Sequence, residues 1–147
     1  LHLYAGVLTD GGVRVAHDLE TGLPAVLLDA EQMRQVIINL VDNAMEALGG
    51  PASPGRPGGP RPSILVRTAF DDASGRVHLL VSDNGPGVAP ADRDKLFMPY
   101  YSTKGRGSGL GLAIVRRIVA DHGGTIDAQA SVPVGTTFTI DLPCLRS

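Results

Sequence analysis

The hydrophobic and polar positions along this chain follow two periods, one helical and one strand-like. In residues 29–48 the apolar side chains recur at intervals of three and four, which predicts an amphipathic helix with one wide apolar face. We expect this face to lie in the core, with Asp29 capping the first turn and Gly49 and Gly50 ending the helix. The face consists of Met33, Val36, Ile37, Leu40, Val41, Ala44, Met45 and Leu48.

The opposite side of this helix is polar and includes two asparagines four residues apart, Asn39 and Asn43. Asparagine is a poor helix former because its side chain competes for nearby backbone groups. Side chains at this spacing lie on one surface of a helix, so both amide oxygens can face one ligand. A solvated helix flank is the alternative interpretation. The same side also carries Gln32, Gln35 and Glu46.

Strand-like runs separated by turn residues fill much of the remaining chain. Ahead of the helix they lie at residues 3–8, 13–19 and 25–29, with turn signals at 9–12 and 21–24. After the helix, residues 63–70 and 76–82 predict a hairpin whose turn is formed by residues 71–75. Residues 125–132 and 136–143 predict a second hairpin around Gly135 that completes the sheet.

Glycine-rich segments interrupt this pattern at residues 49–62, 83–87 and 105–111, and a stretch with little regular structure precedes the last of them. Residues 49–62 are rich in glycine and proline and predict a flexible loop. Residues 83–87, DNGPG, follow a strand; they are either a plain turn or a backbone segment that lies close to another group. Residues 88–108 contain few core-forming runs and predict a lid.

The third segment, GRGSGLG at residues 105–111, runs directly into a second amphipathic helix that Gly123 and Gly124 end. Such a loop presents free amides and the positive end of the helix dipole, a site suited to phosphate. Lys104 and Arg106 add positive charge. A flexible hinge is the alternative, and neither GxxxxGK[ST] nor GxGxxG occurs here. The helix has its apolar positions at Leu110, Ile114, Val115, Ile118 and Val119.

Composition narrows the class of protein. With 147 residues and a net charge of -2, the chain is a single domain without the basic surface of a nucleic-acid-binding protein. Its one cysteine, Cys144, has no internal partner, which favours a reducing compartment. No apolar run reaches the length of about 20 residues that a membrane helix needs. Because the chain starts at Leu1 rather than Met, we expect it to be one domain of a larger parent protein.

Four motifs in order resemble the catalytic ATP-binding domain of sensor histidine kinases, in the superfamily shared with DNA gyrase, Hsp90 and MutL. They are NLVDNAMEAL with Asn39 and Asn43, DNGPG, LFMPYYSTK around Phe97, and GRGSGLGLAIV. The run from Phe97 to Gly124 is similar to the nitrogen-regulation type. The resemblance implies an α+β fold, the Bergerat-type two-layer α/β sandwich, over residues 1–147. A mixed, mostly antiparallel sheet would pack on about three helices, with an ATP lid at 88–108.

The resemblance also implies ligands and site residues. Asp83 would accept a hydrogen bond from the adenine amino group, and Gly85 and Gly87 would let the chain pass close to the base. Asn43 would bind Mg²⁺ through its amide oxygen, with the triphosphate and water as the other ligands. Phe97 would anchor the lid, or is an ordinary core residue. The phosphates would be held by Lys104, Arg106, Gly107, Gly109, Leu110 and Gly111.

The activity implied is that of a protein-histidine kinase, with Asn39 and Asn43 in the catalytic site. The γ-phosphate of ATP would pass to a histidine in a dimerisation domain outside this chain, and a response regulator would be the downstream partner. In ATP-hydrolysing relatives a glutamate acts as general base at position 39. Asn39 cannot take a proton, so we expect poor hydrolysis. A related ATPase and a degenerate binding module are the alternatives.

The four histidines stand in strand-like or helix-terminal settings and not in a recognisable phosphoacceptor motif, so we expect surface or structural roles for His2, His17, His78 and His122. The resemblance implies a cytoplasmic domain that contacts neither the membrane nor nucleic acid directly, whether or not its parent is anchored in a membrane.

Overall fold

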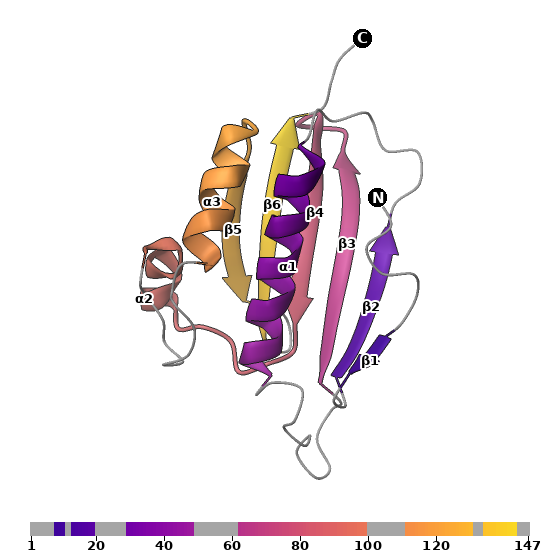
Figure 1. Cartoon of the computed structure of the whole chain (residues 1–147), viewed down its shortest axis with the longest axis vertical. Coiled ribbons are helices and arrows are strands. Elements are labelled where there is room, and N and C mark those ends of the chain that lie inside the picture. Colours follow the sequence, from indigo (N-terminus) through magenta and orange to yellow (C-terminus); the bar gives the residue numbers. More distant parts are fainter. Residues whose placement is uncertain are drawn as a thin grey trace.

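The computed structural model describes residues 8–10, 13–19, 29–48, 62–99, 111–130 and 134–143. Six strands form one sheet in the order β1-β2-β3-β4-β6-β5, in which only β2 and β3 pair in parallel. Helices α1 and α3 lie side by side on one face of this sheet (Figure 1). The predicted two-layer α+β sandwich with a mixed, mostly antiparallel sheet is therefore confirmed.

The elements in chain order are β1 (Leu8–Asp10), β2 (Val13–Leu19), α1 (Ala30–Ala47), β3 (Ser63–Asp71), β4 (Arg76–Asp83), α2 (Pro90–Arg93), the 3-10 helix η1 (Asp94–Phe97), α3 (Gly111–Asp121), β5 (Thr125–Ala130) and β6 (Thr136–Pro143). Both predicted hairpins, β3–β4 and β5–β6, are confirmed. Thr9 and Asp10, predicted as turn residues, belong to β1, because they continue the antiparallel ladder with β2. Residues 3–7 and 25–28, from two of the predicted strands, lie outside the described residues, and Asp29 is the N-cap of α1.

Helix α1 has the predicted start and the predicted buried face. The Asp29 side chain accepts a hydrogen bond from the Gln32 N–H at 3.1 Å, which satisfies one of the free amides of the first turn. Every predicted core position of the helix is buried except Met45 and Leu48, which pack against the core while partly exposed. The predicted end at Gly49 and Gly50 lies outside the described residues.

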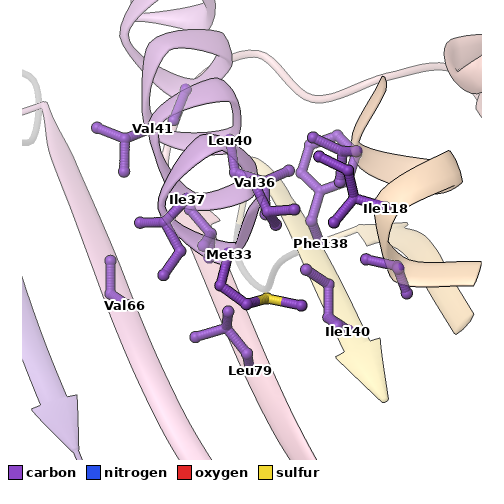
Figure 2. Packing of buried hydrophobic residues seen from close by; sticks show 14 of the residues in the cluster. Met33, Val36, Ile37, Leu40, Val41, Val66, Leu79, Ile118, Phe138 and Ile140 are labelled. Carbon is purple, nitrogen blue, oxygen red and sulfur yellow. The ribbon is translucent and has the colours of Figure 1, made fainter. Parts of the chain in front are cut away.

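The core lies between α1, α3 and the facing side of the sheet. Burial alternates strictly along β4 and β6, so one face of each strand contacts the helices. Figure 2 shows Met33 and Leu40 of α1 in one cluster with Leu79 of β4 and with Phe138 and Ile140 of β6. Each such side chain contributes about 1.5–3 kcal/mol when it is fully removed from water.

The turn between β3 and β4 is built on Asp71. The Ser74 hydroxyl donates to its carboxylate at 2.9 Å and the Ala73 N–H at 3.0 Å, and these bonds hold the pKa of Asp71 below its ordinary value. The Gly75 N–H closes the turn on the Asp71 carbonyl, and its φ of 69° is one that glycine adopts without strain. This turn forms at the end of β4 opposite Asp83, so it shapes the hairpin and not the site described below.

Helices α1 and α3 are joined at one end by His122. Its Nε2 accepts a hydrogen bond from the Asp29 N–H at 3.0 Å, and its Nδ1 donates to the Ile118 carbonyl at 2.8 Å. The structural role expected for this histidine is confirmed. Val115, Ile118 and Val119 of α3 are buried, whereas Ile114 is 41% exposed because it points about 100° away from Val115 around the helix.

Within the described residues, no helix combines the length and the apolar character needed to cross a membrane.

Candidate functional site

Asp83 is the last residue of β4 and is a buried carboxylate, with 5% of its surface exposed. It stands directly opposite Thr136 in the ladder with β6, and Thr136 is the other buried polar residue among those the structure describes. The Gly85 N–H donates to Asp83 Oδ1 at 2.9 Å. Removing a carboxylate from water is costly unless donors compensate, so this burial indicates a dedicated role.

The DNGPG segment is not a hairpin turn, because the next element after β4 is α2 rather than a paired strand. A Cβ added at Gly85 would lie 3.0 Å from Asp83 Oδ1 and 3.1 Å from the Ala47 carbonyl oxygen. Gly87 has a φ of 81°, and a Cβ there would lie 3.2 Å from the Gly135 carbonyl oxygen. The predicted close approach is therefore real, and the groups approached are the end of α1 and the start of β6.

Gly135 belongs to the same cluster, although sequence reasoning treated it only as a hairpin glycine. It has a φ of 111°, and a Cβ there would overlap the Asp83 carbonyl oxygen and lie 2.9 Å from the Asn84 Cα. The backbone of Asp83 thus packs directly against Gly135, where any residue with a Cβ would collide with it. The burial of Asp83 has a signal in the sequence. The alternating apolar positions Val77, Leu79 and Val81 continue to Asp83 and place its carboxylate on the buried face of β4.

Asn39 connects α1 to the start of α3. Its Nδ2 donates to the Gly111 carbonyl oxygen at 3.3 Å, and its Oδ1 accepts from Gln35 Nε2 at 3.4 Å. Asn39 and Asn43 are both half-buried, as expected for neighbours on one side of the helix. The simple solvated flank is therefore excluded for Asn39, whose side chain makes a contact between two helices.

Gly111 begins α3, an 11-residue helix whose first turn carries no acidic residue. This is the expected position for the end of a phosphate-binding glycine loop. The other predicted members of that loop, Lys104, Arg106, Gly107, Gly109 and Leu110, lie outside the described residues, so their roles stay predictions.

Asn43 fits a Mg²⁺ ion that arrives with a nucleotide. Magnesium is commonly held by one or two protein oxygens together with substrate phosphates and water, and the amide oxygen of Asn43, one turn beyond Asn39, has the chemistry that such a ligand needs. Among the described residues, no three His, Cys, Asp or Glu side chains gather into a metal-binding group.

Phe97 ends η1 and is buried, with its ring edge-on to Phe138 at a centroid distance of 6.0 Å. This pair fixes the segment that follows DNGPG to the sheet, and it is worth about 0.5–1.5 kcal/mol beyond the buried area. The interpretation of Phe97 as a core residue is confirmed. The lid assigned to residues 88–108 stays a prediction, and α2 and η1 occupy its first part.

Comparison with known proteins identifies relatives of one kind. The family model described as histidine kinase-, DNA gyrase B- and HSP90-like ATPase matches residues 28–146. The sensor histidine kinase ZraS of Escherichia coli (strain K12) is 38% identical over 121 residues, which cover 82% of this chain and 23% of ZraS. The sensory histidine kinase/phosphatase NtrB of Rhizobium leguminosarum bv. phaseoli is 41% identical over 144 residues, covering 91% of this chain and 36% of NtrB. The chain thus spans well under half the length of these relatives.

Solved structures similar to this chain are also histidine kinases. Full-length ShkA in complex with AMPPNP superposes with a TM-score of 0.76 at 31% identity, covering 93% of this chain and 27% of that one. The catalytic domain of the histidine kinase ThkA gives 0.74 at 29% identity, covering 91% of this chain and 80% of that one. ThkA in complex with the response regulator TrrA gives a TM-score of 0.71 at 26% identity, covering 92% of this chain and 35% of that one. This chain belongs to the histidine kinase-, DNA gyrase B- and HSP90-like ATPase family, as a catalytic ATP-binding domain of the sensor histidine kinase type.

Proposed function

We propose that this domain binds ATP with Mg²⁺ and transfers the γ-phosphoryl group to a histidine in a dimerisation domain of its parent protein. The observation that carries the proposal is the buried carboxylate of Asp83, set on a glycine-fitted turn between the end of α1 and the start of β6. A buried carboxylate at the end of a strand can accept a hydrogen bond from one donor group on the edge of a flat ring, such as the amino group of adenine.

Asp83 is the residue that distinguishes adenine. A carboxylate accepts hydrogen bonds only, and adenine offers an amino group where guanine has a carbonyl oxygen. Gly85 and Gly87 let this backbone lie against the end of α1 and the start of β6, which holds the Asp83 carboxylate where the base would bind. The complex of ShkA with AMPPNP supports an adenine nucleotide as the ligand class.

Asn43 holds the metal and the start of α3 holds the phosphates. When bound, Mg²⁺ supplies positive charge that offsets the charge on the phosphate oxygens. The amides of Gly107, Gly109, Leu110 and Gly111, with Lys104 and Arg106, bind the phosphates at the helix N-terminus. The contact between Asn39 and Gly111 supports this arrangement, because it ties the phosphate-binding end of α3 to the helix that carries Asn43.

The reaction is an in-line phosphoryl transfer. The bond between the γ-phosphorus and the bridging oxygen breaks as a neutral imidazole nitrogen bonds to phosphorus, and ADP leaves with the electron pair. The attacking imidazole nitrogen already has a lone pair, so the domain does not have to remove a proton before attack. Its task is to position the γ-phosphoryl group and to neutralise the charge on the phosphate oxygens. Asn39 has no basic atom for activating water, which favours transfer over hydrolysis.

The acceptor histidine and a response regulator are the partners in this proposal. His122 is engaged in bonds between two helices and His78 lies 3.7 Å from Asp141 on the sheet, so both serve the fold. The complex of ThkA with TrrA supports a response regulator as a partner class. We place the domain in the cytoplasm, where ATP is available.

Thermal melts with ATP, ADP and GTP, each with and without Mg²⁺, test the nucleotide site. A ligand at 100 times its Kd stabilises by about 2.7 kcal/mol, which is about 5–10 °C for a domain of this size. We expect the shift to require adenine, to increase with Mg²⁺ and to fall in Asn43→Ala. No shift with any nucleotide would refute the proposal.

Transfer is tested by incubating the domain and γ-labelled ATP with the parent protein's dimerisation domain. We expect label on the acceptor histidine, acid-labile as a phosphoramidate is, and little free phosphate without the acceptor. Sustained phosphate release in the absence of an acceptor would instead identify an ATPase.

A further inference from the structure

Asn84, the residue after Asp83, ends the pairing of β3 with β4 through its side chain as well as its backbone. The last residues paired in the β3–β4 register are Ile64 and Asp83, and the next pair along the ladder is Ser63 with Asn84. The Asn84 N–H donates to the Ser63 carbonyl at 3.3 Å, as in a regular antiparallel pair. The return bond is different, because the Ser63 N–H donates to the side-chain oxygen Asn84 Oδ1, at 2.8 Å.

The side chain of Asn84 therefore takes the acceptor role that a main-chain carbonyl has in a regular ladder. Its backbone can then leave the sheet immediately after Asp83 while the Ser63 amide, half-buried, stays paired. Asparagine is suited to this exchange because its amide oxygen mimics a peptide carbonyl at a turn.

This exit fixes the carboxylate of Asp83. The direction of the chain at Asn84 sets where the Gly85 N–H points, and that N–H is bound to Asp83 Oδ1 at 2.9 Å. On the other side, the Asp83 backbone rests on Gly135. The carboxylate is thus held from the sheet through Asn84 and Ser63, and from the turn through Gly85.

We propose that Asn84 is a positioning residue for base recognition, which sets the direction of the Asp83 carboxylate and thereby the preference for adenine over guanine. This inference rests on the proposed function, in which Asp83 reads the adenine amino group. A leucine at position 84 has a similar shape but no acceptor, so it leaves the Ser63 N–H unpaired and frees the turn to shift. Aspartate keeps an acceptor oxygen at the same distance from the backbone, whereas glutamine moves it outward by one methylene.

The experiment measures the Kd of ATP and of GTP for the unmodified domain and four variants, Asn84→Leu, Asn84→Gln, Asn84→Asp and Ser82→Ala. We expect the ratio of the GTP Kd to the ATP Kd to fall about tenfold in Asn84→Leu, because a misdirected Asp83 carboxylate loses about one hydrogen bond's worth of preference for adenine. Asn84→Gln, which keeps a polar amide and so guards against failure to fold, should also lower the ratio. Asn84→Asp should keep it.

Ser82→Ala is the matched control. It also removes a side-chain bond between strands next to Asp83, from Ser82 Oγ to Thr137 Oγ1 at 2.9 Å, but this bond lies on β4 ahead of the turn. We expect it to lower stability without changing the ratio. If Asn84→Leu and Asn84→Gln keep the unmodified ratio, or lose no more of it than Ser82→Ala, the role of Asn84 is refuted while the nucleotide site stands. Equal binding of ATP and GTP by the unmodified domain would refute the adenine role of Asp83 itself.

Discussion

Replacing Gly135 with alanine tests whether the site is built by close packing of two distant backbone segments. The added Cβ would overlap the Asp83 carbonyl oxygen and lie 2.8 Å from its carbon, so one of the two segments has to move. The φ of 111° adds backbone strain, since residues with a Cβ rarely adopt it. The change therefore perturbs both the stability of the domain and the position of Asp83.

The magnitude follows from these two terms. A residue held in a sparsely populated backbone region costs about 1–3 kcal/mol, and overpacking a tight contact typically costs about 1–3 kcal/mol more. The expected total of about 2–6 kcal/mol is a large share of the roughly 5–15 kcal/mol that stabilises an ordinary domain. For a chain of this length, it lowers Tm by about 5–20 °C.

Gly123→Ala is the matched control for the backbone term. Gly123 also has a positive φ, 76°, but a Cβ there would lie 3.5 Å from Pro143 Cγ, an ordinary contact. It should therefore cost about 1–2 kcal/mol and leave nucleotide binding unchanged. Urea unfolding of both variants, with ATP binding measured on the folded fraction, separates the terms. Equal destabilisation by the two substitutions would refute the packing of Gly135 against Asp83.

Three other substitutions test the core, the contact between helices and the surface turn. Leu40→Ala removes a fully buried side chain and should lower the free energy of unfolding by about 2–5 kcal/mol in urea, whereas a loss below 1 kcal/mol would place Leu40 outside the packed core. Asn39→Asp replaces the donor to the Gly111 carbonyl with an acceptor, so calorimetry should show weaker binding of ATP but unchanged binding of adenosine; an equal loss for both ligands would contradict a role at the phosphate end. Ser74→Ala removes the largest cause of the low pKa of Asp71, so an NMR titration should show that pKa rising towards its ordinary value. Because the folded-state pKa is lowered, the turn stabilises the fold above the ordinary pKa of Asp71 and loses this contribution as the pH falls through the lowered value, and the variant should show less of this acid dependence. An unchanged pKa in Ser74→Ala would contradict the assigned cause.

Elements with local determinants could be predicted from the sequence. The spacing of apolar residues in α1 and the Asp29 cap lie within one stretch of chain, and so do the turn residues between β3 and β4. The parallel pairing of β2 with β3 could not be predicted in this way. Its register joins residues 14–19 to residues 63–68 across the whole of α1, and no turn signal marks a crossover connection.

The candidate site shows the same division. Asn39 and Asn43 became candidates because asparagine is unusual in the middle of a helix, whereas Asp83 became one only through the resemblance of the DNGPG motif to a known family. The fit of Gly135 against Asp83 and the bond from Ser63 to Asn84 were not predicted, because each joins segments far apart in the sequence and leaves no periodic trace. The same holds for the bond between Asp29 and His122, which depends on two helix ends meeting.

These long-range contacts matter for function because they fix the site before a nucleotide arrives. Asn39 ties the middle of α1 to the first residue of α3, and His122 ties the end of α3 to the first turn of α1. Two bonds at separate points oppose sliding and rotation of one helix along the other. Asn43 is carried by α1 and Gly111 by α3, so the proposed metal ligand and the proposed phosphate-binding helix end keep their separation without a ligand. Binding a nucleotide then costs little free energy for ordering this part of the site. The binding energy of the triphosphate is therefore available for aligning its γ-phosphoryl group with the acceptor.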